Sequence, residues 1–264
     1  GQIAICNDGA IVPAYVRKGI PMEDACTYTL RACSSVELGP LETNMTSCYN
    51  WLKMPVALHN ALRQLKEASA ERAITMADIF EAFGRFVKED VAAMVTRCNS
   101  LKSNCAGEKN IGSSKFLSSW DFAFESLLIR DCVARGKNAS KGGSRYTIPT
   151  VFCSGIATVG NSLMAIKRVV FDEQRYSFAE FMDIVDADYE GQECFRQEIV
   201  NVIPKFGNDD REVDDLTRRA ALLVTEIIED AFAACDLRVV PGFYSLFTHH
   251  WIGMKLPATP DGRR

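Results

Sequence analysis

The sequence has little that points to a membrane or to a nucleic acid. No apolar run approaches the roughly 18 residues that a membrane span needs, and the start carries no signal-peptide-like apolar stretch. Lys and Arg number 30 against 34 Asp and Glu, which gives a formal net charge of −4 with the signs mixed along the chain. Nucleic-acid-binding proteins usually carry a basic stripe or tail, and none is present here. These absences predict a protein that binds no nucleic acid and no membrane.

Paired metal ligands are also missing. The ten cysteines are scattered, none forms a Cys-x-x-Cys pair, and the sequence has only three histidines. The closest cysteine pairs, Cys26 with Cys33 and Cys98 with Cys105, are too widely spaced for a structural zinc site. At 264 residues with 47% hydrophobic content, the chain can build its own core without disulfides. We therefore predict reduced thiols, no metal and a cytoplasmic location.

Helical patterns dominate what is present. Long amphipathic stretches predict helices over residues 75–98, 120–136, 177–191 and 212–236. Thr75 with Asp78 and Ser177 with Glu180 have the spacing of capping boxes, and Gly191 is expected to end the third of these helices.

Short β-like runs lie between the helices, at residues 3–6, 146–148 with 151–152, and 237–240. Strands that alternate with long helices indicate an α/β architecture, with helices outside a sheet or barrel.

Several local patterns have ordinary explanations when they are taken alone. The stretch 136–146, "GKNASKGGSRY", lacks the order of a phosphate-binding loop and suggests a solvent loop. The acidic run 208–215 suits the first turn of the following helix better than a cation site. His249 and His250 are adjacent, so they would point to opposite faces of a strand. Cys33 by itself would be a packed small residue.

The succession of motifs changes this interpretation. In order, the chain contains "ICNDGAIVPAYVRKGIPMEDACTYTLRAC", "GGSRY", "NSLMAIKRVVF", "PKFGNDD" and "ATPDGR". Together these resemble the glycyl radical enzymes, the family that includes pyruvate formate-lyase, glycerol dehydratase, choline lyase and the arylacetate decarboxylases. The resemblance implies part of a ten-stranded α/β barrel, with helices outside and the active-site cysteine loop inside. Residues 1–264 would be a fragment of a single barrel domain, without its N-terminal half and without the C-terminal glycyl radical domain.

The resemblance identifies Cys33 as the residue that becomes a thiyl radical and abstracts a hydrogen atom from the substrate. The thiol must stay protonated until then, and a dry apolar pocket favours this because burial raises a thiol pKa. The family's radical glycine lies in an Arg-Val-x-Gly-Tyr motif, which this sequence does not contain. The glycyl radical would therefore lie outside this chain, installed by a partner S-adenosylmethionine-dependent iron–sulfur activating enzyme. The chain itself would bind no cofactor, and the complete protein would be a homodimer.

The sequence departs from the family beside the thiol. Most dehydratase, amine-lyase and decarboxylase branches carry Cys-x-Glu, whereas here the +2 position is Ser35 and the nearest carboxylate is Glu37. If the loop carries two extra residues, Glu37 takes the acid/base role. Otherwise Ser35 offers only a polar contact to the substrate. Ser34 replaces the second cysteine of the pyruvate-cleaving branch, which disfavours that chemistry.

The function expected for the complete protein is a radical lyase that eliminates a C–O or C–N bond from a small oxygenated or amine substrate. Two alternatives stay open at this point. One is a glycyl radical decarboxylase or a C–C lyase like formate acetyltransferase. The other is an inactive paralogue that only binds a ligand or a partner, because resemblance of fold does not by itself establish activity.

Overall fold

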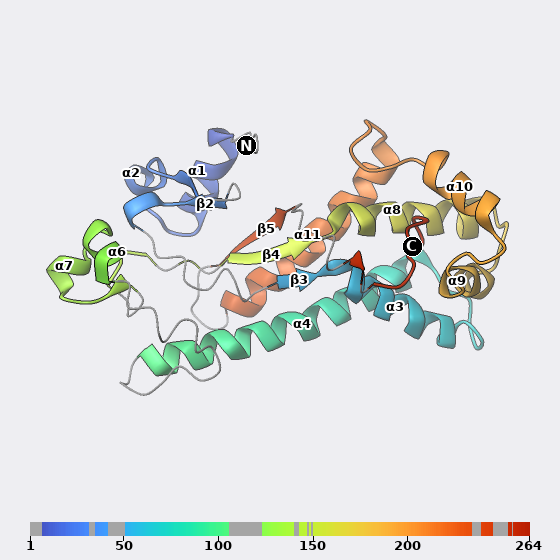
Figure 1. The fold of residues 1–264 in the computed structure, drawn as a ribbon, viewed down its shortest axis with the longest axis horizontal. Coiled ribbons are helices and arrows are strands. Elements are labelled where there is room, and N and C mark those ends of the chain that lie inside the picture. The colour runs from blue at the N-terminus through green and yellow to red at the C-terminus, as the bar shows by residue number, and fades with distance from the viewer. Residues whose placement is uncertain are drawn as a thin grey trace. The chain divides into compact units, whose positions relative to one another are not determined.

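The computed structural model describes residues 7–31, 35–41, 51–105, 123–139, 143–146, 148, 150–233, 239–244, 253–254 and 256–264 (Figure 1). The chain divides into two compact units. The hairpin unit comprises Gly1–Asn50, Met94–Thr150 and Phe232–Val240, and the sheet unit comprises Trp51–Ala93, Val151–Ala231 and Pro241–Arg264.

The hairpin unit is built around a two-stranded antiparallel sheet. Strands β1 (Thr29–Arg31) and β2 (Ser35–Glu37) follow helices α1 (Asp8–Arg17) and α2 (Met22–Ala25), and a 3₁₀ turn, η2 (Gly39–Leu41), comes after them. Its core consists of six buried side chains, namely Tyr15, Ile20, Ala25, Leu38, Leu41 and Ile148.

The helix predicted over residues 120–136 is not continuous. The described part forms two short helices, α6 (Ala123–Leu128) and α7 (Cys132–Arg135). Asp131 separates them with a φ of 73°, a left-handed conformation that an α-helix cannot contain. The prediction of one helix was therefore wrong.

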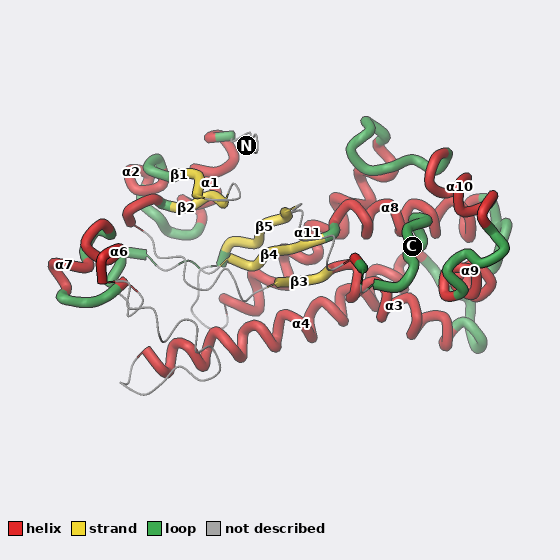
Figure 2. The backbone as a smooth tube through the Cα atoms, viewed as in Figure 1, coloured by secondary structure: helices red, strands yellow, loops and turns green. Residues whose placement is uncertain are grey.

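The sheet unit contains a three-stranded sheet in the order β3-β4-β5 (Figure 2). Strand β3 (Trp51–Lys53) runs parallel to β4 (Thr150–Ser154), with Leu52 opposite Cys153, and β5 (Val240–Tyr244) lies on the other side of β4. The strand predicted at Val151 and Phe152 is confirmed as β4. Of the strand predicted at 237–240, only Val240 belongs to β5, Val239 lies just before the strand, and residues 237 and 238 are outside the described part. The strand predicted at 3–6 is also outside it.

Helices alternate with these strands along the chain, as in an α/β protein. They are α3 (Met54–Ala68), α4 (Met76–Cys105), α8 (Ile156–Ile166), the π-helical η5 (Lys167–Asp172), α9 (Phe178–Asp186), α10 (Glu193–Asn201) and α11 (Arg211–Ala233). The α/β class is thus confirmed, while the ten-stranded barrel stays a prediction.

Both predicted capping boxes are present. The Thr75 backbone N–H donates to Asp78 Oδ2 over 2.8 Å, and the Asp78 N–H donates back to Thr75 Oγ1 over 3.2 Å. Ser177 and Glu180 exchange the same pair of bonds at the start of α9. These bonds satisfy backbone donors that would otherwise lack a partner in the first turn.

The end of α9 differs from the prediction. The helix stops at Asp186, and Asp188 and Tyr189 adopt positive φ angles of 55° and 56° before Gly191 is reached. Tyr189 is fully buried, and its hydroxyl donates to the Thr259 carbonyl over 2.8 Å. A long-range contact therefore coincides with the end of the helix, which the prediction assigned to Gly191.

Candidate functional site

The predicted catalytic residues belong to the β1–β2 hairpin. Arg31 pairs with Ser35 across the two strands, so only three residues join them, and Cys33 is the middle one. Cys33 itself lies outside the described residues. The backbone of Ser35 begins β2.

Glu37 lies at the far end of β2, opposite Thr29. Its side chain is only 8% exposed. The pairing runs without a bulge from Ser35 to Glu37, so their Cα atoms are about 7 Å apart along the strand. A mostly buried carboxyl group therefore lies on the strand that leaves the cysteine connection, and its acid/base role stays a prediction.

Two hydrogen bonds connect β2 and the turn after it to other parts of the hairpin unit. The Tyr15 hydroxyl donates to the Val36 carbonyl over 3.2 Å. The Tyr146 N–H donates to the Leu41 carbonyl over 3.0 Å, just after β2. The hairpin is thus fastened to α1 and to the "GGSRY" motif.

Within that motif, Arg145 and Tyr146 form a cluster with two aspartates that we call the Arg145 clamp (Asp24, Asp131, Arg145 and Tyr146). Arg145 Nε and Nη2 donate to the two carboxylate oxygens of Asp131 over 3.0 and 3.2 Å. Arg145 Nη1 lies 3.4 Å from both oxygens of Asp24, and the Tyr146 hydroxyl donates to Asp24 Oδ2 over 2.5 Å. The hydrogen bonds from Arg145 lower the pKa of Asp131.

The clamp is part of the packed structure rather than a solvent loop. Asp24 is 7% exposed, although Arg145 itself is partly open to solvent. A Cβ atom at Gly143 would lie 2.2 Å from the Lys137 carbonyl oxygen, so only glycine fits there. The interpretation of this stretch as a solvent loop is therefore wrong for residues 143–146.

The "PKFGNDD", "NSLMAIKRVVF" and "ATPDGR" motifs meet in the sheet unit. The Phe206 N–H donates to Asn161 Oδ1 over 2.8 Å, which joins the first two. Arg196 Nη1 donates to the Gly262 carbonyl over 3.0 Å, and Arg264 Nε donates to the Asp188 carbonyl over 2.9 Å. These contacts fasten residues 256–264, which we call the terminal segment, onto α10 and the turn before it.

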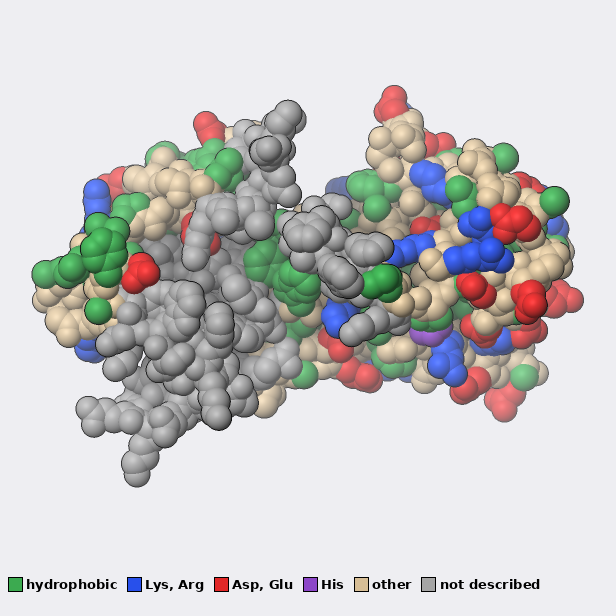
Figure 3. All heavy atoms as spheres, viewed as in Figure 1, with side chains coloured by type: hydrophobic (Ala, Val, Ile, Leu, Met, Phe, Trp, Pro, Cys, Tyr) green, Lys and Arg blue, Asp and Glu red, His purple; other side chains and the backbone are tan. Residues whose placement is uncertain are grey.

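Two titratable groups at the terminal segment are affected by burial: Asp261, which belongs to the segment, and Lys205, which interacts with Asp261. Burial raises the pKa of the Asp261 carboxyl group and lowers the pKa of the Lys205 ammonium group. Acidic and basic side chains are mixed on the visible face around α10 (Figure 3), and Arg196 pairs there with Glu193 over 2.6 Å. In the described residues these motifs contribute contacts that hold the segment in place.

Glu212 and Asp214 lie in the first turn of α11, which confirms the predicted acidic first turn. Asp210 Oδ1 also accepts the backbone N–H groups of Glu212 and Val213 over 3.0 and 3.3 Å. His249 and His250 lie outside the described residues. Within the described ranges, no three His, Cys, Asp or Glu side chains gather as a metal site would require. Within the same ranges, no helix is both long and apolar enough to cross a membrane.

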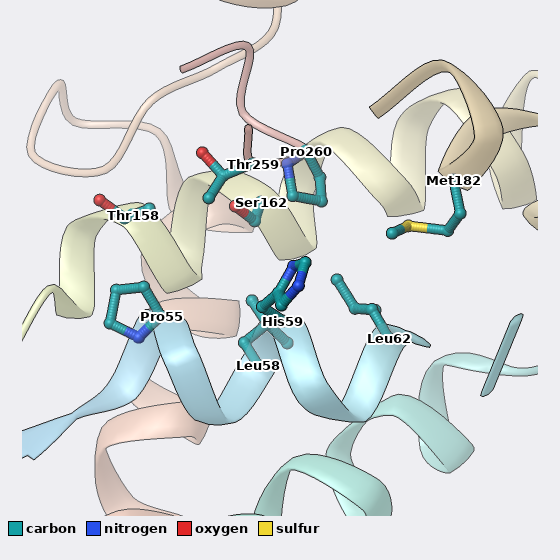
Figure 4. A pocket seen from close by; sticks show the side chains of 9 residues that line it. All are labelled: Pro55, Leu58, His59, Leu62, Thr158, Ser162, Met182, Thr259 and Pro260. Atoms are coloured by element: carbon teal, nitrogen blue, oxygen red, sulfur yellow. The ribbon is translucent and has the colours of Figure 1, made fainter. Parts of the chain in front are cut away.

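The sheet unit also contains a small cavity between α3, α8, α9 and the terminal segment (Figure 4). Its lining residues are Pro55, Leu58, His59, Leu62, Thr158, Ser162, Met182, Thr259 and Pro260. No sequence motif marks His59 or Ser162 as members of one site. The signal in the sequence is a histidine and a serine among the apolar positions of two amphipathic helices.

Comparison with known proteins gives a consistent family assignment. The family model described as pyruvate formate lyase-like matches residues 1–253. The chain is 25% identical over 274 residues to the probable dehydratase YbiW of Escherichia coli (strain K12), and this match covers 100% of the chain and 34% of that protein.

Two solved structures share the fold. The glycerol-bound B12-independent glycerol dehydratase of Clostridium butyricum matches with a TM-score of 0.77 and 22% identity, over 98% of this chain and 32% of that one. A glycyl radical enzyme of Archaeoglobus fulgidus matches with a TM-score of 0.74 and 22% identity, over 97% of this chain and 32% of that one. The chain thus spans about a third of the length of the proteins it matches.

Proposed function

Because the chain belongs to the pyruvate formate lyase-like family, we propose that it is part of a glycyl radical lyase. The reaction class is elimination of a C–O or C–N bond from a small oxygenated or amine substrate. The names of the matched dehydratases support this class over carbon–carbon cleavage.

The observation that carries the proposal is the hairpin with Cys33 at the middle of its three-residue connection. Cys33 is only two positions from both Arg31 and Ser35, the last paired residues of the two strands, and hydrogen transfer between a thiol and a substrate requires closely positioned groups. The mostly buried Glu37 on the following strand supplies a carboxyl group in the same hairpin.

The chain's own residues would then act in sequence. The Cys33 S–H bond would break homolytically, and its hydrogen atom would pass to the glycyl radical, which lies outside this chain. The resulting thiyl sulfur would take a hydrogen atom from a substrate C–H bond. Glu37 gives a proton to the leaving hydroxyl or amine group, which departs as water or ammonia. Cys33 gives the abstracted hydrogen atom to the product radical and becomes a thiyl radical again, and it returns to the thiol when it takes a hydrogen atom back from the glycine outside this chain.

Water and oxygen must be kept from the sulfur, since oxygen would drive the sulfur toward its oxidised acids. The proposal accordingly includes anaerobic activity in the cytoplasm. We also propose that an S-adenosylmethionine-dependent iron–sulfur activating enzyme binds the complete protein and installs the radical. The complete protein is proposed to be a homodimer. Ser35 is proposed as a polar contact to the substrate.

The test uses the full-length protein, activated anaerobically by its radical-generating partner. Cys33→Ala should abolish turnover while the glycyl radical remains visible by electron paramagnetic resonance. Cys26→Ala is a matched control, because Cys26 is an exposed thiol in the same unit, and it should leave both turnover and radical unchanged.

Turnover that survives Cys33→Ala would overturn the assignment of the abstracting thiol. A full-length protein without a radical after activation would support the non-catalytic alternative instead. Release of carbon dioxide or formate from the substrate, in place of water or ammonia, would move the protein to the decarboxylase or carbon–carbon lyase branch.

A further inference from the structure

The cavity of the sheet unit contains a hydroxyl group that lacks a partner. Ser162 lies on α8 and is 0% exposed. Its Oγ atom has no hydrogen-bond partner within the described part of the chain. Buried hydroxyl groups in folded proteins are nearly always hydrogen-bonded. Where no protein atom is the partner, an ordered water molecule usually is.

His59 borders the same space from α3. Its imidazole ring points toward the gap between α3 and α8, near Ser162 and Pro260 (Figure 4). A neutral imidazole has one N–H donor and one acceptor nitrogen, so either ring nitrogen can bond to a water molecule. His59 and Ser162 therefore bring polar groups to the cavity from two different helices.

The charges around His59 favour the neutral ring. Burial is the main cause of its lowered pKa, and Arg63 on the same helix lowers the pKa further. Asp186 of α9 acts in the opposite direction, but it is paired with Lys66 over 2.5 Å. The lining residues from α8 and the terminal segment, Thr158, Ser162, Thr259 and Pro260, carry no charge.

The size of the cavity limits what can bind. Its volume is about 10 Å³, which is close to the smallest space that holds one water molecule. The apolar side chains of Leu58, Leu62 and Met182 complete the wall. Such a wall disfavours an ion, because it offers no compensating charge.

We propose that this cavity is a binding site for a single water molecule, which bridges Ser162 Oγ and a ring nitrogen of His59. The water connects α3 to α8 beside the terminal segment that carries the "ATPDGR" motif. This site is separate from the cysteine hairpin and does not depend on the proposed reaction.

A crystal structure of the full-length protein at about 1.8 Å resolution or better is the direct test. The expected result is a single well-ordered water peak within hydrogen-bonding distance of both Ser162 Oγ and His59. An empty cavity, or a Ser162 hydroxyl turned to a backbone carbonyl, would overturn the proposal. A density peak with the coordination of a metal ion would also overturn it.

The effect of Ser162→Ala on stability is a second, independent test, because the two models of the cavity predict changes of different sign. Ser162→Ala removes one of the two partners of the water, so the folding equilibrium constant should fall about two- to tenfold. If the hydroxyl group were unpartnered in a dry cavity, the same change would leave the constant unchanged or increase it, which contradicts the proposal.

Ser154→Ala is the matched control. Ser154 is 6% exposed in the same unit, and its Oγ donates to the Leu52 carbonyl over 3.2 Å, so this hydroxyl has a protein partner. Both variants should lower stability, but only Ser162→Ala should shift the titration of His59. An unchanged His59 titration in Ser162→Ala would show that no water couples the two side chains.

Discussion

His59 gives the sheet unit a pH response close to neutrality, where a histidine ordinarily titrates. Burial, with help from Arg63, lowers its pKa from the ordinary value of 6.5. The unfolded chain therefore binds a proton at a higher pH than the folded chain does. The resulting stabilisation is fully present above about pH 6.5 and is lost as the pH falls toward the lowered folded-state value.

His59→Gln should remove this part of the pH dependence, because glutamine keeps a polar side chain but does not titrate. Urea unfolding of the full-length protein at pH 7.5 and pH 5.5 measures the difference. Asn60→His is the control, since it adds an exposed histidine to the same helix and should leave the difference unchanged. An equal loss of stability at low pH in His59→Gln would assign the effect to other groups.

Glu37 is the second residue with a specific expectation. Glu37→Gln keeps the size of the side chain but removes the titratable proton. If Glu37 is the acid/base group, turnover of the activated protein should fall by about 10²- to 10⁴-fold while the radical signal persists. Glu125→Gln, on the exposed face of α6, is the matched control and should leave turnover unchanged. Normal turnover in Glu37→Gln would assign proton transfer to another group.

At the scale of elements, the Arg145 clamp explains why "GGSRY" occurs beside the cysteine hairpin. Arg145 connects α2 to the turn before α7, and the Tyr146 N–H bonds the chain that leaves β2. A planar guanidinium group with two carboxylate partners restricts both of them, which lysine cannot reproduce. The motif therefore has a structural role: it supports the segment that follows the hairpin.

Asp24→Ala should loosen this support. It leaves the Tyr146 hydroxyl group without its 2.5 Å acceptor and removes one partner of Arg145. Loss of a buried acceptor of this kind costs about 1–3 kcal/mol, which chemical denaturation can measure. Glu23→Ala, at the neighbouring exposed position, should cost little. Equal stability of the two variants would remove the structural role assigned to the clamp.

The close contact of α8 with α11 requires glycine at position 160, because a side chain there would collide with Thr217. A Cβ atom at Gly160 would lie 1.9 Å from Thr217 Oγ1, and Thr217 is itself buried. Gly160→Ala should therefore force the two helices apart and cost about 1–3 kcal/mol in the free energy of unfolding.

Gly84 of α4 provides the opposite control. A Cβ atom there would be 3.4 Å from Leu223, which is an ordinary contact. Gly84→Ala should stabilise the protein by about 0.5–1 kcal/mol, because alanine favours the helix. Thermal unfolding of both variants should give shifts of opposite sign, and shifts of the same sign would contradict the packing argument.

At the scale of the whole molecule, the chain spans about a third of the proteins it matches. It carries the proposed abstracting cysteine, whereas the Arg-Val-x-Gly-Tyr motif does not occur in its sequence. We expect the full-length protein to store a glycyl radical after activation and to lose both radical and turnover in air. Electron paramagnetic resonance before and after exposure to oxygen measures this, and oxygen-stable turnover would contradict the proposed chemistry.

The success of the sequence predictions depended on the range of the interactions involved. Thr75 with Asp78 and Ser177 with Glu180 were correct because each capping box joins residues three positions apart. The helix over 120–136 was wrong because Asp131 interrupts it in a left-handed conformation and pairs with Arg145, 14 positions further along. Long-range contacts of this kind leave no periodic trace in the sequence.

The α/β class, the helices over 75–98, 177–191 and 212–236, and the family could be predicted from residue patterns alone, because motifs such as "ATPDGR" are contiguous. That Asp24 meets Arg145 across 121 positions, and that His59 and Ser162 border one cavity, could be seen only in the folded chain. A contact between distant residues depends on how whole helices pack. A local pattern records which residues form a helix and which of its faces is apolar, but not which side chains that face will meet.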